Sequence, residues 1–256
     1  MTEQPSDLPS AQAYLEVLDP IMARVRAQAD GPVQDAAELI AQSIADDGVL
    51  QTFGSGHSEA LAMELAGRAG GLVPSNRLAL RDVVIHGGES PDLLSDGILE
   101  RDPTVAQRVL DLAALRPADV FVIGSSSGVN GSVVELARLV KERGHALIAI
   151  TSLDHTSQVE SRHPSGAKLV DLADVVLDNG APYGDAVLDA PGGARVCAVS
   201  SITAALLAQL VTAEVVRRLA ERGLPLPVYL SANVPEGDEH NNALEAKYAG
   251  RIRRTA

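Results

Sequence analysis

The sequence predicts an α/β protein, a three-layer, doubly wound parallel sheet that follows an N-terminal helical extension. From residue 49 onward, short apolar runs alternate with helical patterns. Such alternation favours parallel strands joined by right-handed crossovers. Apolar residues make up 46% of the 256 residues, whereas aromatic residues make up only 2%. A core of Ala, Val, Leu and Ile suits strands that alanine-rich helices bury on both faces.

Two helices are predicted between Leu8 and Asp47. The first carries an apolar stripe at helical spacing and ends at Asp30-Gly31-Pro32. This first helix could cover its own domain or pack on a partner subunit. We expect a helical arm over residues 1–47, the main domain over 48–230 and a polar tail over 231–256.

Strands and helices are then expected in alternation. The predicted strands are residues 49–53, 82–85, 119–123, 146–150 and 174–177. The predicted helices are one that ends near residue 69, then 104–115, 132–143 and a long one over 196–222. Gly144 is a suitable C-terminal stop for the third of these helices.

The charge of the chain excludes several kinds of partner. The sequence has 34 acidic and 21 basic residues, a formal charge of −13. A negative field repels nucleic acid and anionic membranes, so we expect neither as a partner. Any phosphate must therefore be held locally, by backbone amides, hydroxyls and helix N-termini.

Cysteine and histidine usage indicates neither a metal nor a cofactor. Cys197 is the single cysteine of the sequence, so no intrachain disulfide can form and the Cys-rich zinc patterns are missing. The histidines show no strong ligand spacing. Residues 1–10 contain no apolar signal core, and polar residues interrupt the apolar segment 196–216. We expect a cytoplasmic protein.

Small hydroxyl residues gather at three predicted strand ends. They are Ser55 and Ser58, then Ser125, Ser126 and Ser127, then Thr151 and Ser152. In open α/β sheets, ligands sit beyond the carboxyl ends of the strands. Amide groups at a helix start bind phosphate oxygens, and hydroxyls add hydrogen bonds without positive charge. The pattern predicts a phosphate site, and ordinary helix capping is the alternative explanation for any one loop.

Two of these loops resemble those of a known family. Residues 53–68, with Gly-Ser-Gly-His-Ser and Glu-Leu-Ala-Gly-Arg, resemble the first phosphate loop and helix of sugar isomerase (SIS) domain proteins. Residues 122–130, with Ser-Ser-Ser-Gly, are similar to the second loop of that family. Segments 161–166 and 237–241 look typical of a bacterial subgroup of stand-alone SIS proteins.

The resemblance implies a flavodoxin-like sheet and a sugar-phosphate ligand. It also implies a dimer or a dimer of dimers, with sites near the subunit interface. The side chains that it implies at the phosphate are Ser55, Ser58, Ser125, Ser126, Ser127 and Asn130, with Thr151 and Ser152 lining the same pocket.

SIS enzymes share the abstraction of a proton at C2 of the sugar, which needs a carboxylate near C2. Glu64 is the first candidate base, because it follows the first loop as the catalytic glutamate does in the similar heptose-phosphate isomerases. Glu59 is its rival. Glu89 is a further candidate, because the similar N-acetylmuramate 6-phosphate etherases carry a glutamate after the second strand. Each could equally be a solvated surface carboxylate.

Two histidines are also candidates. His57 lies inside the first loop and could open the sugar ring or bind a hydroxyl. His240 lies in the polar tail, and in several SIS enzymes a tail from the neighbouring subunit reaches the active site. A purely structural role is the alternative for both.

The predicted reaction is a C2 proton abstraction followed by elimination at C3, on an N-acetylhexosamine 6-phosphate or a related sugar phosphate. The similar heptose-phosphate isomerases use a histidine on the last long helix, and residues 196–222 contain none. An aldose–ketose isomerase and a non-catalytic sugar-phosphate sensor are the alternatives.

Other α/β functions fit the sequence less well. Glu59 occupies the third glycine position of a dinucleotide-binding fingerprint, where side-chain volume obstructs close packing. No Gly-Lys-Ser or Gly-Lys-Thr motif of a P-loop is present. The run Gly124 to Gly128 does fit the Gly-x-Ser-x-Gly elbow of serine hydrolases, but that reading leaves the first serine loop unexplained.

Overall fold

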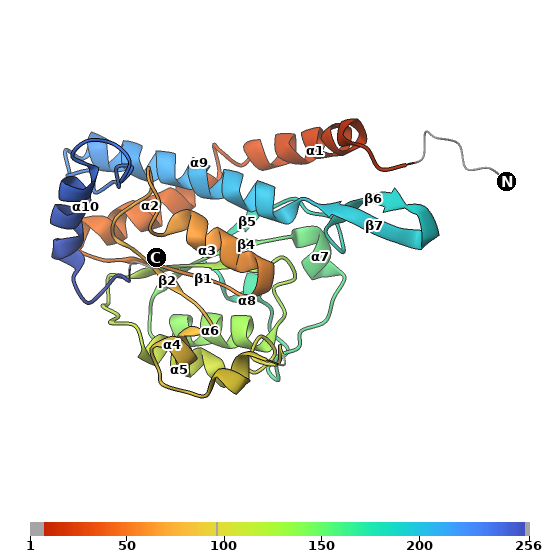
Figure 1. Ribbon diagram of the computed structural model, residues 1–256, viewed down its shortest axis with the longest axis horizontal. Helices are drawn as coiled ribbons and strands as arrows, with labels where there is room; N and C mark the ends of the chain where they lie inside the picture. The colour runs from red at the N-terminus through yellow and green to blue at the C-terminus, as the bar shows by residue number, and fades with distance from the viewer. Residues whose placement is uncertain (1–7, 96, 254–256) are drawn as a thin grey trace.

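A five-stranded parallel sheet forms the centre of the computed structural model, which describes residues 8–95 and 97–253 (Figure 1). The strand order is β2-β1-β3-β4-β5, so the chain winds outward from β1 in both directions. The strands are β1 (Leu50–Gly54), β2 (Ser75–Leu78), β3 (Val120–Gly124), β4 (Ala146–Thr151) and β5 (Val175–Asp178). The predicted doubly wound parallel sheet is confirmed.

The alternation of side chains along β3 divides the core into two layers. Val120 and Val122 pack into a cluster on one face of the sheet, whereas Phe121 and Ile123 pack into a cluster on the other. All five residues of β3 are buried, because helices cover both faces and successive side chains of a strand point to opposite sides.

Helices α2 (Pro32–Ala45), α3 (Glu59–Leu65) and α9 (Ser200–Glu221) cover the first face (Figure 1). They contribute to the same apolar cluster as alternate residues of the strands. Helix α2 begins at Pro32, which suits the first turn of a helix because proline lacks the amide hydrogen that would be unpaired there. Helix α2, from the predicted arm, therefore shares the core of the sheet.

The second face carries α4 (Asp82–Ile85), α5 (Val105–Asp111), α6 (Gly131–Glu142) and α8 (Leu169–Leu172). The strand predicted over residues 82–85 is wrong, because these residues form α4 and the strand lies at Ser75–Leu78. The Asp82 carboxylate accepts a hydrogen bond from the Ala79 amide at 3.0 Å and so starts a helical turn. The true strand is polar in sequence, yet Asn76 is buried and donates to the side chain of Gln51.

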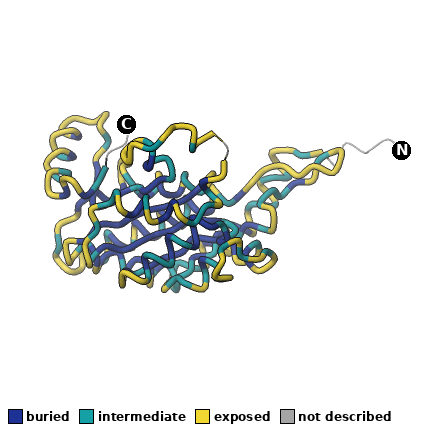
Figure 2. Tube along the Cα trace, turned by 90° about the horizontal axis from the view of Figure 1, so that it is seen from below, coloured by how far each residue is buried: buried dark blue, intermediate teal, exposed yellow. Residues whose placement is uncertain are grey.

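A projection that differs from the arm predicted over residues 1–47 extends from the carboxyl edge of the sheet (Figure 2). It consists of α1 (Ala11–Arg26) and an antiparallel hairpin of β6 (Ala186–Ala190) and β7 (Ala194–Ala198). The apolar contacts of α1 include Val187 of this hairpin and Val199 beyond it. Because residues 196–198 belong to β7, the helix predicted over 196–222 begins later than expected, at Ser200.

The C-terminal segment folds back against the amino ends of the strands. Helix α10 (Gly237–Glu245) lies there, and Tyr248 packs with Val49, which directly precedes β1. The guanidinium of Arg251 donates to the buried carboxylate of Asp119 at 2.9 Å. The expected polar tail is thus an ordered part of the domain up to residue 253.

The remaining elements are short. They are α7 (Leu153–Ser157) and the 3-10 turns η2 (Gly56–Ser58), η3 (Pro91–Leu94), η4 (Pro191–Gly193) and η5 (Ala246–Tyr248). Across the described part of the chain, no helix has the length and apolarity needed to span a membrane.

Candidate functional site

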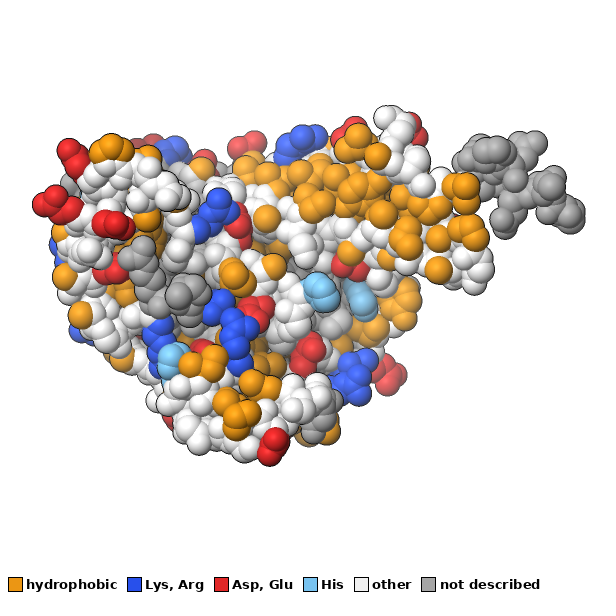
Figure 3. All heavy atoms as spheres, in the orientation of Figure 1, with side chains coloured by type: hydrophobic (Ala, Val, Ile, Leu, Met, Phe, Trp, Pro, Cys, Tyr) orange, Lys and Arg blue, Asp and Glu red, His pale blue; other side chains and the backbone are white. Residues whose placement is uncertain are grey.

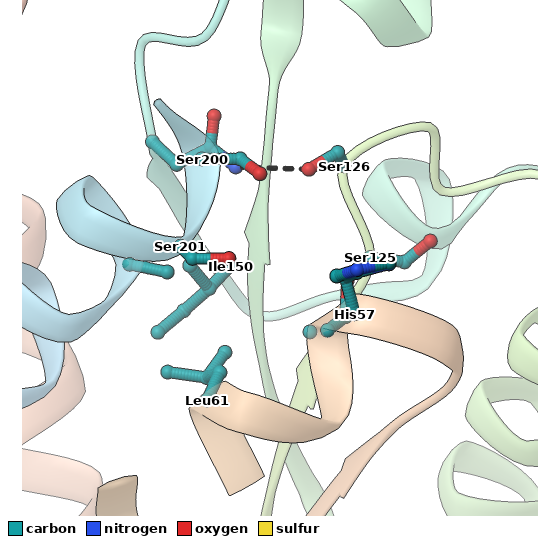
Figure 4. Close-up of a pocket in the computed structure, with 11 residues that line it drawn as sticks. His57, Leu61, Ser125, Ser126, Ile150, Ser200 and Ser201 are labelled. Atoms are coloured by element: carbon teal, nitrogen blue, oxygen red, sulfur yellow. Dashed lines mark hydrogen bonds between the residues drawn. The ribbon is translucent and has the colours of Figure 1, made fainter. Parts of the chain in front are cut away.

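A hollow opens at the carboxyl edge of the sheet, between the ends of β1 and β3 and the start of α9. Figure 4 shows His57 and the serines of the second loop on one side, and Ser200 and Ser201 of α9 on the other. We call it the hydroxyl hollow. Its lining residues are His57, Ser58, Leu61, Gly124, Ser125, Ser126, Ile150, Asn179, Ser200, Ser201 and Ala204. It lies where the strand order reverses, which is where doubly wound sheets bind ligands.

The first loop folds tightly between β1 and α3. The Ser58 amide donates to the Ser55 carbonyl at 3.1 Å. A Cβ atom on Gly54 would lie 2.1 Å from the Ser58 carbonyl oxygen, and Gly56 has a φ of +55°. Glycine is needed at Gly54 for the close approach and at Gly56 for the left-handed backbone, because any other residue would be strained there. This turn brings His57 and Ser58 to the hydroxyl hollow.

The second loop is fixed by its own serines. The Ser125 hydroxyl accepts a hydrogen bond from the Gly128 amide at 3.1 Å. The Ser126 carbonyl accepts one from the Ser152 amide at 3.1 Å, and the Ser126 hydroxyl accepts one from the Asn179 amide group at 3.4 Å. The loop is therefore rigid, and the Ser126 side chain can donate its hydroxyl hydrogen to a ligand in the hollow.

Ser200 and Ser201 were missed by the sequence analysis. They form the first turn of α9 and line the hydroxyl hollow. Asp185 holds this turn in place, because its carboxylate accepts hydrogen bonds from the amides of Val199 at 3.0 Å and Ser200 at 2.8 Å. The run Ser-Ser-Ile-Thr before an apolar stretch is a helix-start signal that could have identified them, but the helix was expected to begin earlier.

Three predicted phosphate ligands do not line the hollow. The hydroxyl of Ser152 is fully buried, where it donates to the Ala181 carbonyl at 2.6 Å. The buried Thr151 hydroxyl lies 3.2 Å from the hydroxyl of Thr156. The Ser127 carbonyl accepts a hydrogen bond from Thr156 at 2.9 Å. The Thr151 hydroxyl thus contacts the second loop and α7, whereas the Ser152 hydroxyl joins the end of β4 to the segment after β5.

Two further predicted ligands, Ser55 and Asn130, bind a carboxylate of the chain itself. Both donate to Oε1 of Glu100, at 2.9 and 2.6 Å respectively. The sequence analysis missed Glu100, since nothing in the surrounding Ile-Leu-Glu-Arg-Asp marks it. Tertiary structure alone brings this carboxylate to both serine loops.

A second, larger hollow is lined by the beginning of the first loop. It has apolar walls and a few polar groups, and we call it the carboxylate hollow because it contains two glutamates. Its lining residues are Gly54, Ser55, Gly56, Glu59, Leu80, Arg81, Leu93, Leu94, Gly97, Leu99 and Glu100.

The three predicted glutamates take different positions. Glu59 lines the carboxylate hollow, where its two oxygens lie 2.9 and 2.7 Å from the guanidinium nitrogens of Arg81. Glu64 points toward α9 and contacts Arg68 and Gln209. Glu89 pairs with Arg108 at 2.5 Å, away from both hollows. Neither Glu64 nor Glu89 lines either hollow within this chain.

The two predicted histidines lie at opposite ends of the sheet. His57 is exposed and is the one ionisable side chain that lines the hydroxyl hollow in the residues that the structure describes. His240 lies on α10, where its Nε2 atom is 3.0 Å from the Val228 carbonyl oxygen. His240 is therefore not brought to the site of its own chain.

Segment 161–166 is anchored beside the second loop. The guanidinium of Arg162 donates to the side-chain oxygen of Asn130 at 3.0 Å. Nε2 of His163 lies 2.9 Å from a carboxylate oxygen of Glu135. The pKa of Glu135 is held below its usual value, mainly by hydrogen bonding to Arg138 and further by His163. Among the residues placed in the structure, no group of three or more His, Cys, Asp or Glu side chains could hold a metal ion.

A doubly wound sheet with two serine loops at its switch point is the arrangement of a phosphosugar-binding domain. Residues 13–152 match the model of the SIS domain, and the chain belongs to the SIS family. Within that family it is similar to a group of bacterial proteins named UPF0309. It is 41% identical to one from Listeria monocytogenes over 86% of this chain and 89% of the relative. It is 34% identical to one from Caldanaerobacter subterraneus over 94% and 98%.

Solved structures agree on the fold. The chain is similar to a phosphoheptose isomerase from Neisseria gonorrhoeae, with a TM-score of 0.51, 22% identity and coverage of 80% of this chain and 98% of that one. It is also similar to a phosphoheptose isomerase from Francisella tularensis, with a TM-score of 0.52, 12% identity and coverage of 81% and 98%.

Proposed function

We propose that this chain is an enzyme that binds a sugar phosphate in the hydroxyl hollow and abstracts its C2 proton. One observation carries the proposal: serine side chains from the first loop, the second loop and the start of α9 converge on one hollow. Hydroxyls and helix-start amides suit a phosphate in a chain whose net charge is −13. The expected phosphate ligands are Ser58, Ser126 and Ser201, since the Ser200 hydroxyl donates to Asp185.

The proposed reaction is elimination at C3 of an N-acetylhexosamine 6-phosphate or a related sugar phosphate. After the C2 proton leaves, a lyase expels the group at C3, whereas an isomerase returns a proton at C1. Helix α9 contains no histidine in its full sequence, and this favours elimination over the chemistry of the similar heptose-phosphate isomerases.

An aldose–ketose isomerase is the second candidate. The solved structures with this fold include proteins named phosphoheptose isomerase, and the same C2 proton step begins both reactions. A single assay separates the two. The purified protein is incubated with N-acetylglucosamine 6-phosphate, and an unsaturated sugar that absorbs in the ultraviolet supports elimination, whereas a ketose phosphate supports isomerisation. Tight binding with no product of either kind would make the chain a sugar-phosphate sensor.

We further expect two copies of the chain to associate. Apolar side chains gather on the solvent side of α9 and the hairpin (Figure 3). Ile202 of α9 is 43% exposed and Val196 of β7 is 36% exposed. Light scattering on the purified chain tests this expectation, and Ile202→Glu should shift a dimer toward the monomer.

A further inference from the structure

Glu100 is fixed at the junction of the two serine loops by its main chain. Its carbonyl oxygen accepts hydrogen bonds from the amide of Ser132 at 3.2 Å and from the Ser132 hydroxyl at 2.8 Å. Ser132 lies in the first turn of α6, which follows the second loop. The preceding Leu99 is buried in the core. The position of Glu100 is thus set by packing and by α6.

The two oxygens of the Glu100 carboxylate have different surroundings. Oε1 accepts hydrogen bonds from Ser55 at 2.9 Å and from Asn130 at 2.6 Å. Within residues 8–95 and 97–253, no hydrogen bond or ion pair reaches Oε2. A Cβ atom on Gly56 would lie 3.6 Å from Oε2, so the glycine leaves this oxygen uncovered on the side of the first loop. One oxygen orients the group and the other has free lone pairs.

The other glutamates near the first loop are placed differently. Both oxygens of Glu59 face Arg81, whereas Glu64 bonds Arg68 and Gln209 through its Oε1 atom and lies outside the carboxylate hollow. A general base needs an oxygen with a free lone pair that a substrate can approach. Glu100 meets this requirement where it lines the carboxylate hollow.

The walls of the carboxylate hollow indicate which part of a substrate it accepts. Four leucines line it: Leu80, Leu93, Leu94 and Leu99. Arg81, a cationic residue of the described lining, already binds Glu59 through two nitrogens. Apolar walls with the Glu100 carboxylate suit the uncharged carbons of a sugar, whereas the hydroxyl hollow, which is lined by the other end of the first loop, suits the phosphate.

We propose that the carboxylate hollow holds carbons 1 to 3 of the sugar phosphate and that Glu100 is the catalytic residue that takes the C2 proton. The inference rests on the proposed function. The C2–H bond breaks and the proton bonds to Oε2 of Glu100. The electron pair of that bond forms the C1–C2 double bond, and the carbonyl electrons move onto O1. Return of a solvent-derived proton to C2 restores the sugar.

The test measures exchange of the C2 hydrogen in heavy water by proton NMR, with N-acetylglucosamine 6-phosphate and glucosamine 6-phosphate as probes. Glu100→Gln retains an oxygen that Ser55 and Asn130 can bind but loses the proton acceptor. We expect its exchange rate to fall at least about 100-fold, while its dissociation constant for the probe changes less than about threefold. Glu142→Gln, an exposed change at the far end of α6, is the matched control and should exchange like the natural chain.

The outcomes separate the inference from the proposed function. If the natural chain neither binds nor exchanges any probe, the proposed function fails. If it exchanges and Glu100→Gln exchanges within threefold of it, or if Glu64→Gln alone abolishes exchange, the inference is overturned. Should the glutamine variant not fold, Glu100→Asp retains the charge but withdraws the carboxylate by one methylene. A rate reduced at least tenfold in that folded variant supports the inference, and an unchanged rate contradicts it.

Discussion

The carboxylate of Asp185 caps helix α9 from across the base of the hairpin, with the Ser200 hydroxyl donating to its Oδ2 atom at 2.6 Å. The same carboxylate accepts the first amides of the helix. Asp185 therefore closes the loop formed by β6 and β7 and fixes the turn that carries Ser201. Residues 14 and 15 positions apart in sequence thus determine one wall of the hydroxyl hollow.

Asp185→Ala should lower the free energy of unfolding by about 1–2 kcal/mol, the usual cost of removing a helix cap. Two amides and one hydroxyl of the α9 start would lose their acceptor. Urea unfolding followed by circular dichroism measures the change. Asp189→Ala, a nearby exposed change within the hairpin, is the control and should stay within about 0.5 kcal/mol. Equal stability of the two variants would contradict the role of Asp185.

Ser126 and Ser152 should respond differently to the loss of a hydroxyl. Ser126→Ala is expected to weaken binding of N-acetylglucosamine 6-phosphate at least about tenfold, since a hydrogen bond to a charged group contributes about 1.5–3 kcal/mol. The free energy of unfolding of Ser126→Ala should change little, because the hydroxyl that it removes makes one long contact, 3.4 Å from the Asn179 side chain. Titration calorimetry measures the affinity, with unphosphorylated N-acetylglucosamine as the reference ligand.

Ser152→Ala should instead lower the free energy of unfolding by about 1–3 kcal/mol, because a buried carbonyl of Ala181 loses its donor. Affinity for the phosphorylated sugar should stay within threefold of the natural chain. If Ser152→Ala weakens binding as much as Ser126→Ala, then Ser152 contacts the ligand and the assignment of the hollow is wrong.

Glu135 should make stability depend on pH in the acidic range. Hydrogen bonds from Arg138 and His163 lower its pKa in the folded protein, so the ionised form stabilises the fold. This stabilisation is present above the unfolded-state pKa and is lost as the pH falls through the lower folded-state pKa. Glu135→Gln should therefore be less stable than the natural chain by about 1 kcal/mol at pH 7.

The difference in the free energy of unfolding between Glu135→Gln and the natural chain should shrink as the pH is lowered below 4.5, the ordinary pKa of the glutamate carboxyl group. Thermal unfolding across pH 3–7 measures it. Glu142→Gln, which removes an exposed partner of the same Arg138, is the control. A stability gap that stays constant over this pH range would show that the ionisation of Glu135 does not contribute.

Arg251 should be important for stability although it lies five residues from the end of the chain. Its side chain is 5% exposed and donates to the fully buried Asp119 at 2.9 Å. Removing one partner of a buried pair leaves a charge without compensation, so Arg251→Ala should cost about 3 kcal/mol. Urea unfolding measures the loss. Arg116→Ala, whose exposed guanidinium pairs with Asp47 at 2.5 Å, should cost less than about 1 kcal/mol, and equal losses would refute the prediction.

Local patterns predicted most of the scaffold but failed at β2. Strands β3, β4 and β5 are mostly apolar in sequence because helices cover both faces of the sheet. Strand β2 is not, since its buried Asn76 is compensated by the hydrogen bond that it donates to Gln51 of β1. The apolar pair Val83–Val84 looked like a strand and forms a helical turn. A periodicity argument cannot detect a polar strand whose partners lie elsewhere in the chain.

The serine loops could be predicted because each follows its strand directly in the sequence. Their partners could not. Glu100 meets Ser55 across 45 residues and Asn130 across 30, through a segment with no recognisable motif. Ser201 reaches the hydroxyl hollow only because the hairpin shifts the start of α9.

The amino-acid sequence alone determined the parallel sheet and the two serine loops, because strand burial and loop chemistry depend on residues that are neighbours in the sequence. From its net charge of −13 we expect neither nucleic acid nor anionic membranes as partners. Tertiary structure decided which hydroxyls face a common hollow and which form hydrogen bonds within the protein. It likewise selected Glu100 over Glu64 as the carboxylate beside both loops, because distances between segments depend on how the layers pack.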